Sequence, residues 1–299
     1  KICKPLAKKF CAEEMAQDTE KPGGALIECM IKHKVHSDMT VECAAVIEHY
    51  QILNLKDFKA SYNLAKTCRD DFTKHCKDTK TPVEALQCLS EIKMKSVIGA
   101  DQKETPGVEQ LSPECAKELN FNLLQRSESV KLDPVLNKAC GEDIEKFCPN
   151  VKPGKRRVTK CLESNRKELS EKCHTLLFKR ERAIYKDQRN DMMLMRRCKG
   201  MIAKHCSKLS HPKRGIIGCL SKAMRKDLDF DVKCMKELVQ RMEVRNVDYR
   251  LHPLLEESCM KDVTTHCQKE LVPQIGDSQK EYNGKVLGCL KKAYVKSTK

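Results

Sequence analysis

The stretch LAKTCRDDFTKHC, residues 64–76, places Leu64, Cys68, Phe72 and Cys76 at intervals of four residues. Positions four apart lie on one face of an α-helix. The residues between them are mostly polar or charged, as on the solvated side of an amphipathic helix. The stretch therefore predicts a helix with one apolar face that carries two cysteines.

Pairs of cysteines eight positions apart occur five times in the 299 residues. The pairs are Cys3 and Cys11, Cys68 and Cys76, Cys140 and Cys148, Cys198 and Cys206, and Cys259 and Cys267. A third cysteine follows every pair (Cys29, Cys88, Cys161, Cys219, Cys289), and a fourth follows in four cases (Cys43, Cys115, Cys173, Cys234). Every fourth cysteine lies 25 positions before the next first cysteine. A self-similar period of roughly 60 residues indicates a tandem array of structural repeats.

The apolar steps of four, and the Pro and Gly residues between the segments that carry them, favour helices joined by loops. We predict an all-α fold, an extended tandem array of disulfide-stapled helical-hairpin repeats. The predicted repeats are residues 1–64, 65–136, 137–195, 196–255 and 256–299. The first has a truncated start and the last lacks a fourth cysteine, so we expect a longer natural chain.

The cysteine content predicts an oxidising compartment. There are 19 cysteines, no tryptophan and only 4% aromatic residues, so the cores are expected to be thin and the disulfides to hold the fold. No apolar run is long enough to span a membrane, so any membrane attachment is expected through a segment outside this sequence.

The spacing restricts the disulfide pairing without fixing it. Two cysteines eight apart on a helix are separated by about 12 Å, whereas a disulfide needs Cα atoms within about 7 Å. We therefore predict pairing of the second with the third cysteine. We favour joining each fourth cysteine to the first of the next repeat, because a closed helical hairpin would demand a constant step; this leaves Cys3 unpaired. The rival joins the first to the fourth within a repeat and leaves Cys259 unpaired.

The favoured scheme places eighteen cysteines in disulfides. They are Cys11, Cys29, Cys43, Cys68, Cys76, Cys88, Cys115, Cys140, Cys148, Cys161, Cys173, Cys198, Cys206, Cys219, Cys234, Cys259, Cys267 and Cys289.

This pattern resembles the cysteine-rich repeats of the cysteine-rich fibroblast growth factor receptor family. The resemblance is carried by Lys9-Phe10-Cys11, Lys74-His75-Cys76, Lys146-Phe147-Cys148, Lys204-His205-Cys206 and Thr265-His266-Cys267, and by Cys-Leu at Cys88, Cys161, Cys219 and Cys289. It covers essentially the whole chain. The departures are Cys29-Met30, where leucine is expected, and the long interval from Cys88 to Cys115.

The resemblance implies a type I membrane glycoprotein of the Golgi lumen, the secretory pathway or the cell surface. It implies binding of fibroblast growth factors or their precursors, and of E-selectin through glycans. The sequence contains no Asn-x-Ser/Thr sequon, so N-linked glycans are not expected here. The alternative is that the repeats are architectural spacers that present other binding regions.

The positive charge is concentrated in the middle of the chain. Residues 152–226 contain 23 Lys/Arg and 6 Asp/Glu, a net of +17, against +16 for the whole chain. The candidate polyanion-binding residues are Lys155, Arg156, Arg157, Lys160, Lys179, Arg180, Arg182, Arg196, Arg197, Lys213 and Arg214. Sulfated glycans such as heparin are the expected polyanions, unless the charges form only a solvated helical face. Nucleic acid is not expected.

The basic region would repel a basic growth factor. A sulfated glycan could bridge the two, or the growth factor could dock on the first two repeats or the last, which are nearly neutral. The sequence leaves both arrangements open.

Metal binding and catalysis are not predicted. His75, His205 and His266 each precede a second cysteine, but Phe replaces histidine at the same position twice, which a metal ligand would not tolerate. No Cys-x-x-Cys pair typical of redox enzymes is present. Acidic pairs such as Asp70-Asp71 are expected at the surface or in the first turns of helices. We predict a binding protein with no cofactor, metal or catalytic residues.

Overall fold

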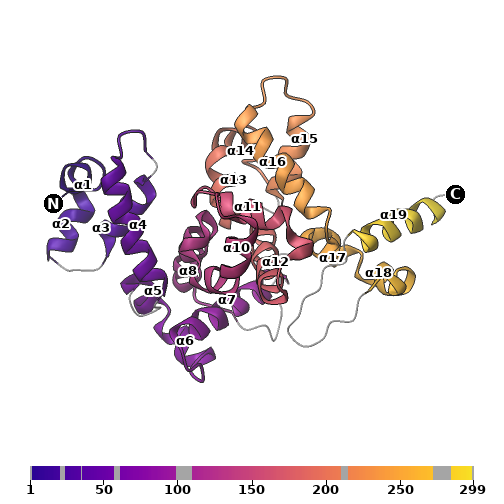
Figure 1. Cartoon of the computed structure of the whole chain (residues 1–299), viewed down its shortest axis with the longest axis horizontal. Helices are drawn as coiled ribbons and strands as arrows, with labels where there is room; N and C mark the ends of the chain where they lie inside the picture. Colours follow the sequence, from indigo (N-terminus) through magenta and orange to yellow (C-terminus); the bar gives the residue numbers. More distant parts are fainter. Residues whose placement is uncertain are drawn as a thin grey trace. The chain divides into compact units, whose positions relative to one another are not determined.

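A computed structural model describes residues 2–20, 24–34, 36–56, 61–98, 110–209, 215–271 and 284–297. The structure is 76% helical and contains no strand among these residues, which confirms the all-α prediction (Figure 1). The chain divides into two compact units. The first comprises Lys1–Ser96, Pro106–Arg126 and Lys131–Val135, and the second Val97–Thr105, Ser127–Val130 and Leu136–Lys299. No helix in the described ranges is long and apolar enough to cross a bilayer.

A seven-residue helix connects the first and second cysteines of every repeat. These helices are α1 (Lys4–Phe10), α6 (Arg69–His75), α10 (Gly141–Phe147), α14 (Lys199–His205) and α18 (Met260–His266). A shorter helix precedes four of them: α5 (Tyr62–Thr67), α9 (Pro134–Ala139), α13 (Met192–Arg197) and α17 (Pro253–Ser258). The stretch 64–76 is thus two short helices that meet at Cys68 rather than one. Leu64 and Cys68 are buried as the spacing predicts.

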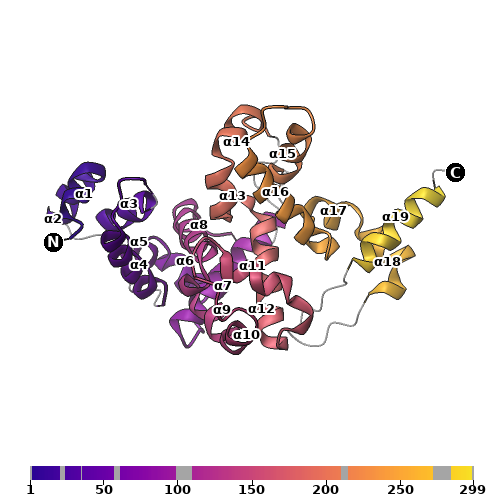
Figure 2. The same ribbon diagram turned by 45° about the horizontal axis from the view of Figure 1, so that its top comes forward.

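Two further helices complete the repeat. The third cysteine lies on α3 (Ala25–His33), α7 (Pro82–Ile98), α11 (Arg157–Ser164), α15 (Ile216–Met224) or α19 (Lys285–Ser297). The fourth lies on α4 (Val41–Lys56), α8 (Pro113–Glu128), α12 (Glu171–Lys186) or α16 (Val232–Arg245). The first repeat also contains α2 (Ala12–Glu20). Helices α3 and α4 lie side by side in both ribbon views (Figures 1 and 2).

Nine disulfides form a nested pair in each complete repeat. The outer disulfides are Cys3–Cys43, Cys68–Cys115, Cys140–Cys173 and Cys198–Cys234. The inner disulfides are Cys11–Cys29, Cys76–Cys88, Cys148–Cys161, Cys206–Cys219 and Cys267–Cys289. The inner pairing was predicted correctly. The favoured pairing of a fourth cysteine with the next first cysteine is wrong, because Cys3 is bonded and Cys259 is the free cysteine.

The constant step of 25 residues is a connector and not a closed hairpin. In the third repeat Cys173 lies near the start of α12, whose 16 residues extend for about 24 Å. A 3-10 turn, Gln188–Asn190, and α13 then lead to Cys198. The two ends of the step are held apart by this helix, so each fourth cysteine pairs back within its own repeat.

A buried aspartate fixes the start of the fourth-cysteine helix in two repeats. Asp143 on α10 accepts hydrogen bonds from the backbone N–H of Ser170 at 2.9 Å and from its hydroxyl at 2.6 Å. Asp71 makes the same two bonds with Ser112, at 3.0 and 2.6 Å. Both aspartates are buried, and Asp71 lies in the first turn of α6, which is one of the two positions expected for it. Ser170 in turn caps α12 by accepting from the N–H of Cys173.

We expect Asp143→Ala to lower the free energy of unfolding by about 2 kcal/mol, because the hydroxyl and the N–H of Ser170 lose their acceptor in a partly buried place. The matched control is Glu142→Gln on the same turn, whose side chain is exposed. Urea unfolding followed by circular dichroism measures both. Equal stabilities of the two variants would contradict the role given to Asp143.

A core surrounds the cysteines of each repeat, and the cores of the first and fourth repeats also take in side chains of another repeat. In the second repeat the core consists of Leu64, Leu86, Leu89, Ile92 and Leu119 around three buried cysteines. Among the described residues of the fifth repeat, the buried apolar side chains are Val263, Cys267 and Val286. Cores of this size supply little apolar burial, which fits the expectation that the disulfides hold the fold.

Candidate functional site

The predicted polyanion-binding residues lie in the second unit and differ widely in exposure. Lys155, Arg157 and Arg197 are exposed. Arg156 is only 4% exposed. The others of the described set are half-buried, namely Lys160, Lys179, Arg180, Arg182 and Arg196. Lys213 and Arg214 lie outside the described residues.

Several of these cations are bound to carboxylates of the same unit. Arg156 pairs with Glu163 at 2.5 Å, and both side chains are buried. Arg182 pairs with Glu256 at 2.8 Å. These contacts consume part of the positive charge that the sequence concentrates here, so the field at the surface is weaker than the count of cations suggests.

Glu237 brings two of the predicted residues together. Its Oε2 lies 3.7 Å from Lys160 Nζ and 3.6 Å from Arg197 Nε, and its Oε1 lies 2.8 Å from Arg241 Nη2. Glu237 is only 4% exposed. Sequence reasoning missed this carboxylate, because a single glutamate on a charged helix carries no pattern that distinguishes a buried position.

The loop before α11 holds the exposed cations in a fixed conformation. Lys155 and Arg156 adopt left-handed backbone angles, with φ of 51° and 57°, directly after Gly154. Such angles are strained in residues other than glycine and require support from their surroundings. The Arg157 guanidinium donates to the carbonyls of Lys152 and Pro153, and the Arg156 N–H donates to the Glu128 carbonyl. These hydrogen bonds hold the backbone of the loop, and Lys155 and Arg157 are exposed to solvent on it.

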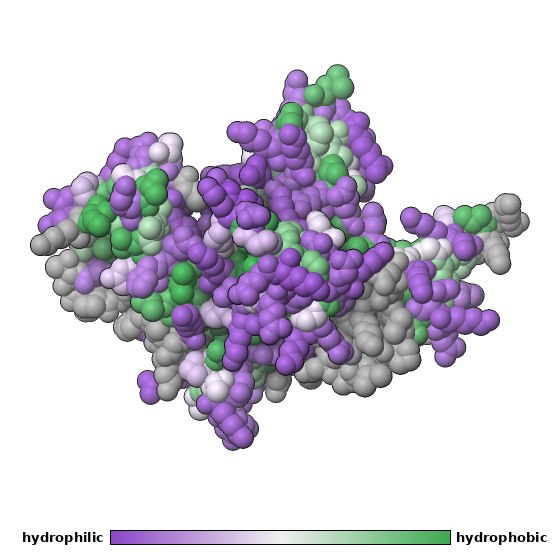
Figure 3. Space-filling view, viewed as in Figure 1, coloured by the Kyte–Doolittle hydropathy of each residue, from purple (hydrophilic) through white to green (hydrophobic). Residues whose placement is uncertain are grey.

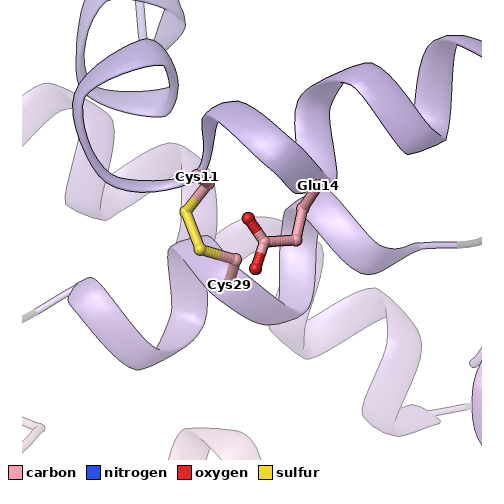
Figure 4. Close-up of side chains that lie close together, drawn as sticks. All are labelled: Cys11, Glu14 and Cys29. Carbon is pink, nitrogen blue, oxygen red and sulfur yellow. A yellow bond between two sulfur atoms is a disulfide. The ribbon is translucent and has the colours of Figure 1, made fainter.

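The cysteines and histidines do not come together as a metal site among the described residues. The one close group of suitable ligand types there is Cys11, Glu14 and Cys29, but the two sulfurs form a disulfide, which removes both thiolates (Figure 4). His205 Nε2 lies 2.7 Å from Asp227 Oδ2, and Lys204 lies 2.8 Å from the same oxygen. Hydrogen bonds from Lys204 and His205 lower the pKa of Asp227 to about 2.

Nested disulfides on short helices, repeated along the chain, define a cysteine-rich tandem-repeat protein. The family model of the cysteine-rich repeat matches residues 41–96, 113–170, 171–227 and 232–298. The chain belongs to this family, that of the cysteine-rich fibroblast growth factor receptor type, as its resemblance predicted.

The relatives with similar sequences carry the name Golgi apparatus protein 1. The chain is 32% identical to that of Mus musculus over 294 residues, which is 98% of this chain and 24% of the relative. It is 33% identical to that of Gallus gallus, covering 98% of this chain and 25% of the relative. The homologue from Caenorhabditis elegans is 26% identical over 310 residues, covering 99% of this chain and 26% of the relative.

The chain therefore spans about a quarter of the length of these relatives. Their names agree with the Golgi and secretory-pathway localisation that the family resemblance implies. No solved structure matches the chain.

Proposed function

We propose that the chain binds fibroblast growth factors or their precursors in the lumen of the secretory pathway, and that its middle region binds sulfated glycans. Membership of the cysteine-rich repeat family carries the proposal for the growth factor. The exposed cations of the rigid loop, Lys155 and Arg157, support the proposal for the glycan. The protein acts by binding and not by catalysis.

The basic loop gives the glycan a specific role. A basic growth factor and a basic loop repel one another, and a sulfated chain is long and anionic enough to contact both. Such an interaction depends on exposed charges and weakens with ionic strength, because the Debye length is about 8 Å at physiological salt. We expect heparin to strengthen binding of the growth factor and added salt to weaken the heparin-dependent part.

The test is surface plasmon resonance of a fibroblast growth factor with the chain at physiological salt, with and without heparin. The double variant Lys155→Glu, Arg157→Glu should weaken the heparin-dependent binding by about tenfold through the reversed local charge. The control variant is Lys77→Glu, Lys80→Glu, which changes exposed lysines in the equivalent loop of the second repeat.

Each outcome has a definite meaning. Loss of the heparin-dependent binding in the Lys155→Glu, Arg157→Glu variant alone supports the basic loop as a glycan-binding site. Equal loss in both variants contradicts a local glycan site. Absence of growth-factor binding both with and without heparin favours the alternative that these repeats are architectural spacers.

A further inference from the structure

A groove of about 820 Å³ opens in the first unit, along α3, α4 and α8. Its apolar walls include Leu26, Ile27, Met30, Ile31, Ile47 and Phe121. Volumes of roughly 300–1,000 Å³ are typical of sites for small ligands or a few side chains. The space-filling view shows hydrophobic residues gathered at the surface of this N-terminal part of the chain (Figure 3).

Helix α8 of the second repeat forms one wall of the groove by packing against the first repeat. Phe121 on α8 packs on the core of the first repeat, and Lys32 Nζ lies 5.6 Å from the centre of its ring. The Gln51 side chain donates to Gln125 at 3.1 Å in the buried part of the same contact. These contacts hold α8 against the first repeat, so the groove is part of the folded structure of the first unit.

Two carboxylates of the groove have no cation bound to them in the described part of the chain. Glu28 on α3 accepts a hydrogen bond from the Asn63 side chain, and Glu118 on α8 is half-buried. Among the described residues, no lysine or arginine forms an ion pair with either of them. Burial raises the pKa of Glu118, and the negative charge of Glu28 raises it further, against smaller opposing effects of Lys117 and Lys32.

The other charged residues of the lining do not remove this negative field. Asp18 accepts hydrogen bonds from the backbone N–H groups of Ala25 and Leu26, so it serves to hold the start of α3. Lys4 is the one lysine among the described lining residues. The groove thus combines apolar walls with two repelling carboxylates, in a chain whose overall charge is +16.

We infer that this groove binds a short segment of a partner protein that presents a lysine or arginine between apolar side chains. The cation would relieve the repulsion between Glu28 and Glu118, and its apolar neighbours would cover the walls. A sulfated glycan would be repelled here, and a purely apolar segment would bury two unpaired carboxylates at a high cost. The inference goes beyond the proposed function, because it holds whether or not the partner is a growth factor.

The experiment uses the full chain and three fluorescent synthetic peptides. The first is Ser-Leu-Leu-Arg-Leu-Leu-Ser, the second has glutamate in place of arginine, and the third has serine in place of every leucine. Fluorescence anisotropy should show that the first binds at least about tenfold more tightly than the glutamate peptide, the size expected for one desolvated charge pair. It should also bind more tightly than the serine peptide, which keeps the cation but loses the apolar contacts with the walls. The variant Glu28→Gln, Glu118→Gln should weaken that binding by about tenfold or more.

The matched control is Glu42→Gln, Glu91→Gln, which removes two exposed carboxylates of the same unit outside the groove lining. It should leave peptide binding unchanged. Thermal unfolding of all variants establishes that the fold is intact. Equal binding of the arginine and glutamate peptides, or equal loss in both variants, would overturn the inference. So would sedimentation showing that a second copy of the chain occupies the groove.

This result is separable from the growth-factor experiment. Peptide binding that depends on Glu28 and Glu118 supports the groove even if no fibroblast growth factor binds. Growth-factor binding that is unaffected by the peptide and by these two substitutions supports the proposed function and rejects the groove as the contact.

Discussion

Replacing Cys68 and Cys115 together by alanine should lower the free energy of unfolding by about 4 kcal/mol, the value expected for opening a loop of this length. Their disulfide closes a separation of 47 residues, the longest of the nine. Both cysteines are fully buried in the core of the second repeat. Without this disulfide, the contacts that remain between α8 and α6 include the small core and the bonds between Asp71 and Ser112.

The matched comparison is the inner disulfide of the same repeat. Cys76–Cys88 closes a separation of only 12 residues, so its removal should cost about 3 kcal/mol. Replacement in pairs avoids leaving a reactive thiol. Urea unfolding of both double variants gives the two free energies. A larger loss for the inner pair would show that chain entropy is not the main contribution of these disulfides.

Arg241→Met should destabilise the second unit by about 3–5 kcal/mol, the usual cost of removing one partner from a buried ion pair. Arg241 is buried on α16 between Asp191 and Glu237, and its Nη2 lies 3.0 Å from Asp191 and 2.8 Å from Glu237. Burial alone would raise the pKa of Asp191, but the neighbouring Arg241 lowers it well below its usual range. The substitution therefore leaves the buried Asp191 without this cation, while Glu237 keeps the more distant Lys160 and Arg197.

A triple variant distinguishes the lost ion pair from lost packing. Adding Asp191→Asn and Glu237→Gln to Arg241→Met removes the two buried negative charges. Asp191 caps α13 by accepting from the N–H of Leu194, and an asparagine side chain at that position can accept the same hydrogen bond. The triple variant should recover most of the lost stability in urea unfolding. If it is no more stable than Arg241→Met, packing of the arginine stem explains the loss.

The sequence predicted the helical repeats because the pattern is local. Cysteines eight apart and apolar residues four apart lie within one or two helical turns, so each of the five copies reports the same short element. The pairing of the first cysteine depends on where the chain travels over 25 residues, and spacing alone does not show this. The long helix α12 lies between Cys173 and Cys198 and keeps these two cysteines apart, which excludes the pairing that we favoured.

The candidate site was predictable only in part. The sequence shows which residues carry positive charge, but not that Arg156 lies buried against Glu163 or that Lys160 and Arg197 share Glu237.

The groove of the first unit was not predictable either. It depends on Phe121 and Glu118 of the second repeat lying beside Glu28 of the first. These residues are far apart in the sequence, and their contact follows no periodic pattern. Periodicity reports which face of a helix is buried, but it does not show which distant helix covers that face.

Peptide mapping of the unreduced protein tests the nested-disulfide account most directly. Proteolysis and mass spectrometry, with the free thiol blocked before digestion, identify each pair of linked peptides. The structure predicts Cys68 joined to Cys115, Cys140 joined to Cys173, and a single blocked thiol at Cys259. Peptides that join Cys43 to Cys68, with the blocked thiol at Cys3, would contradict it and link the repeats to one another instead.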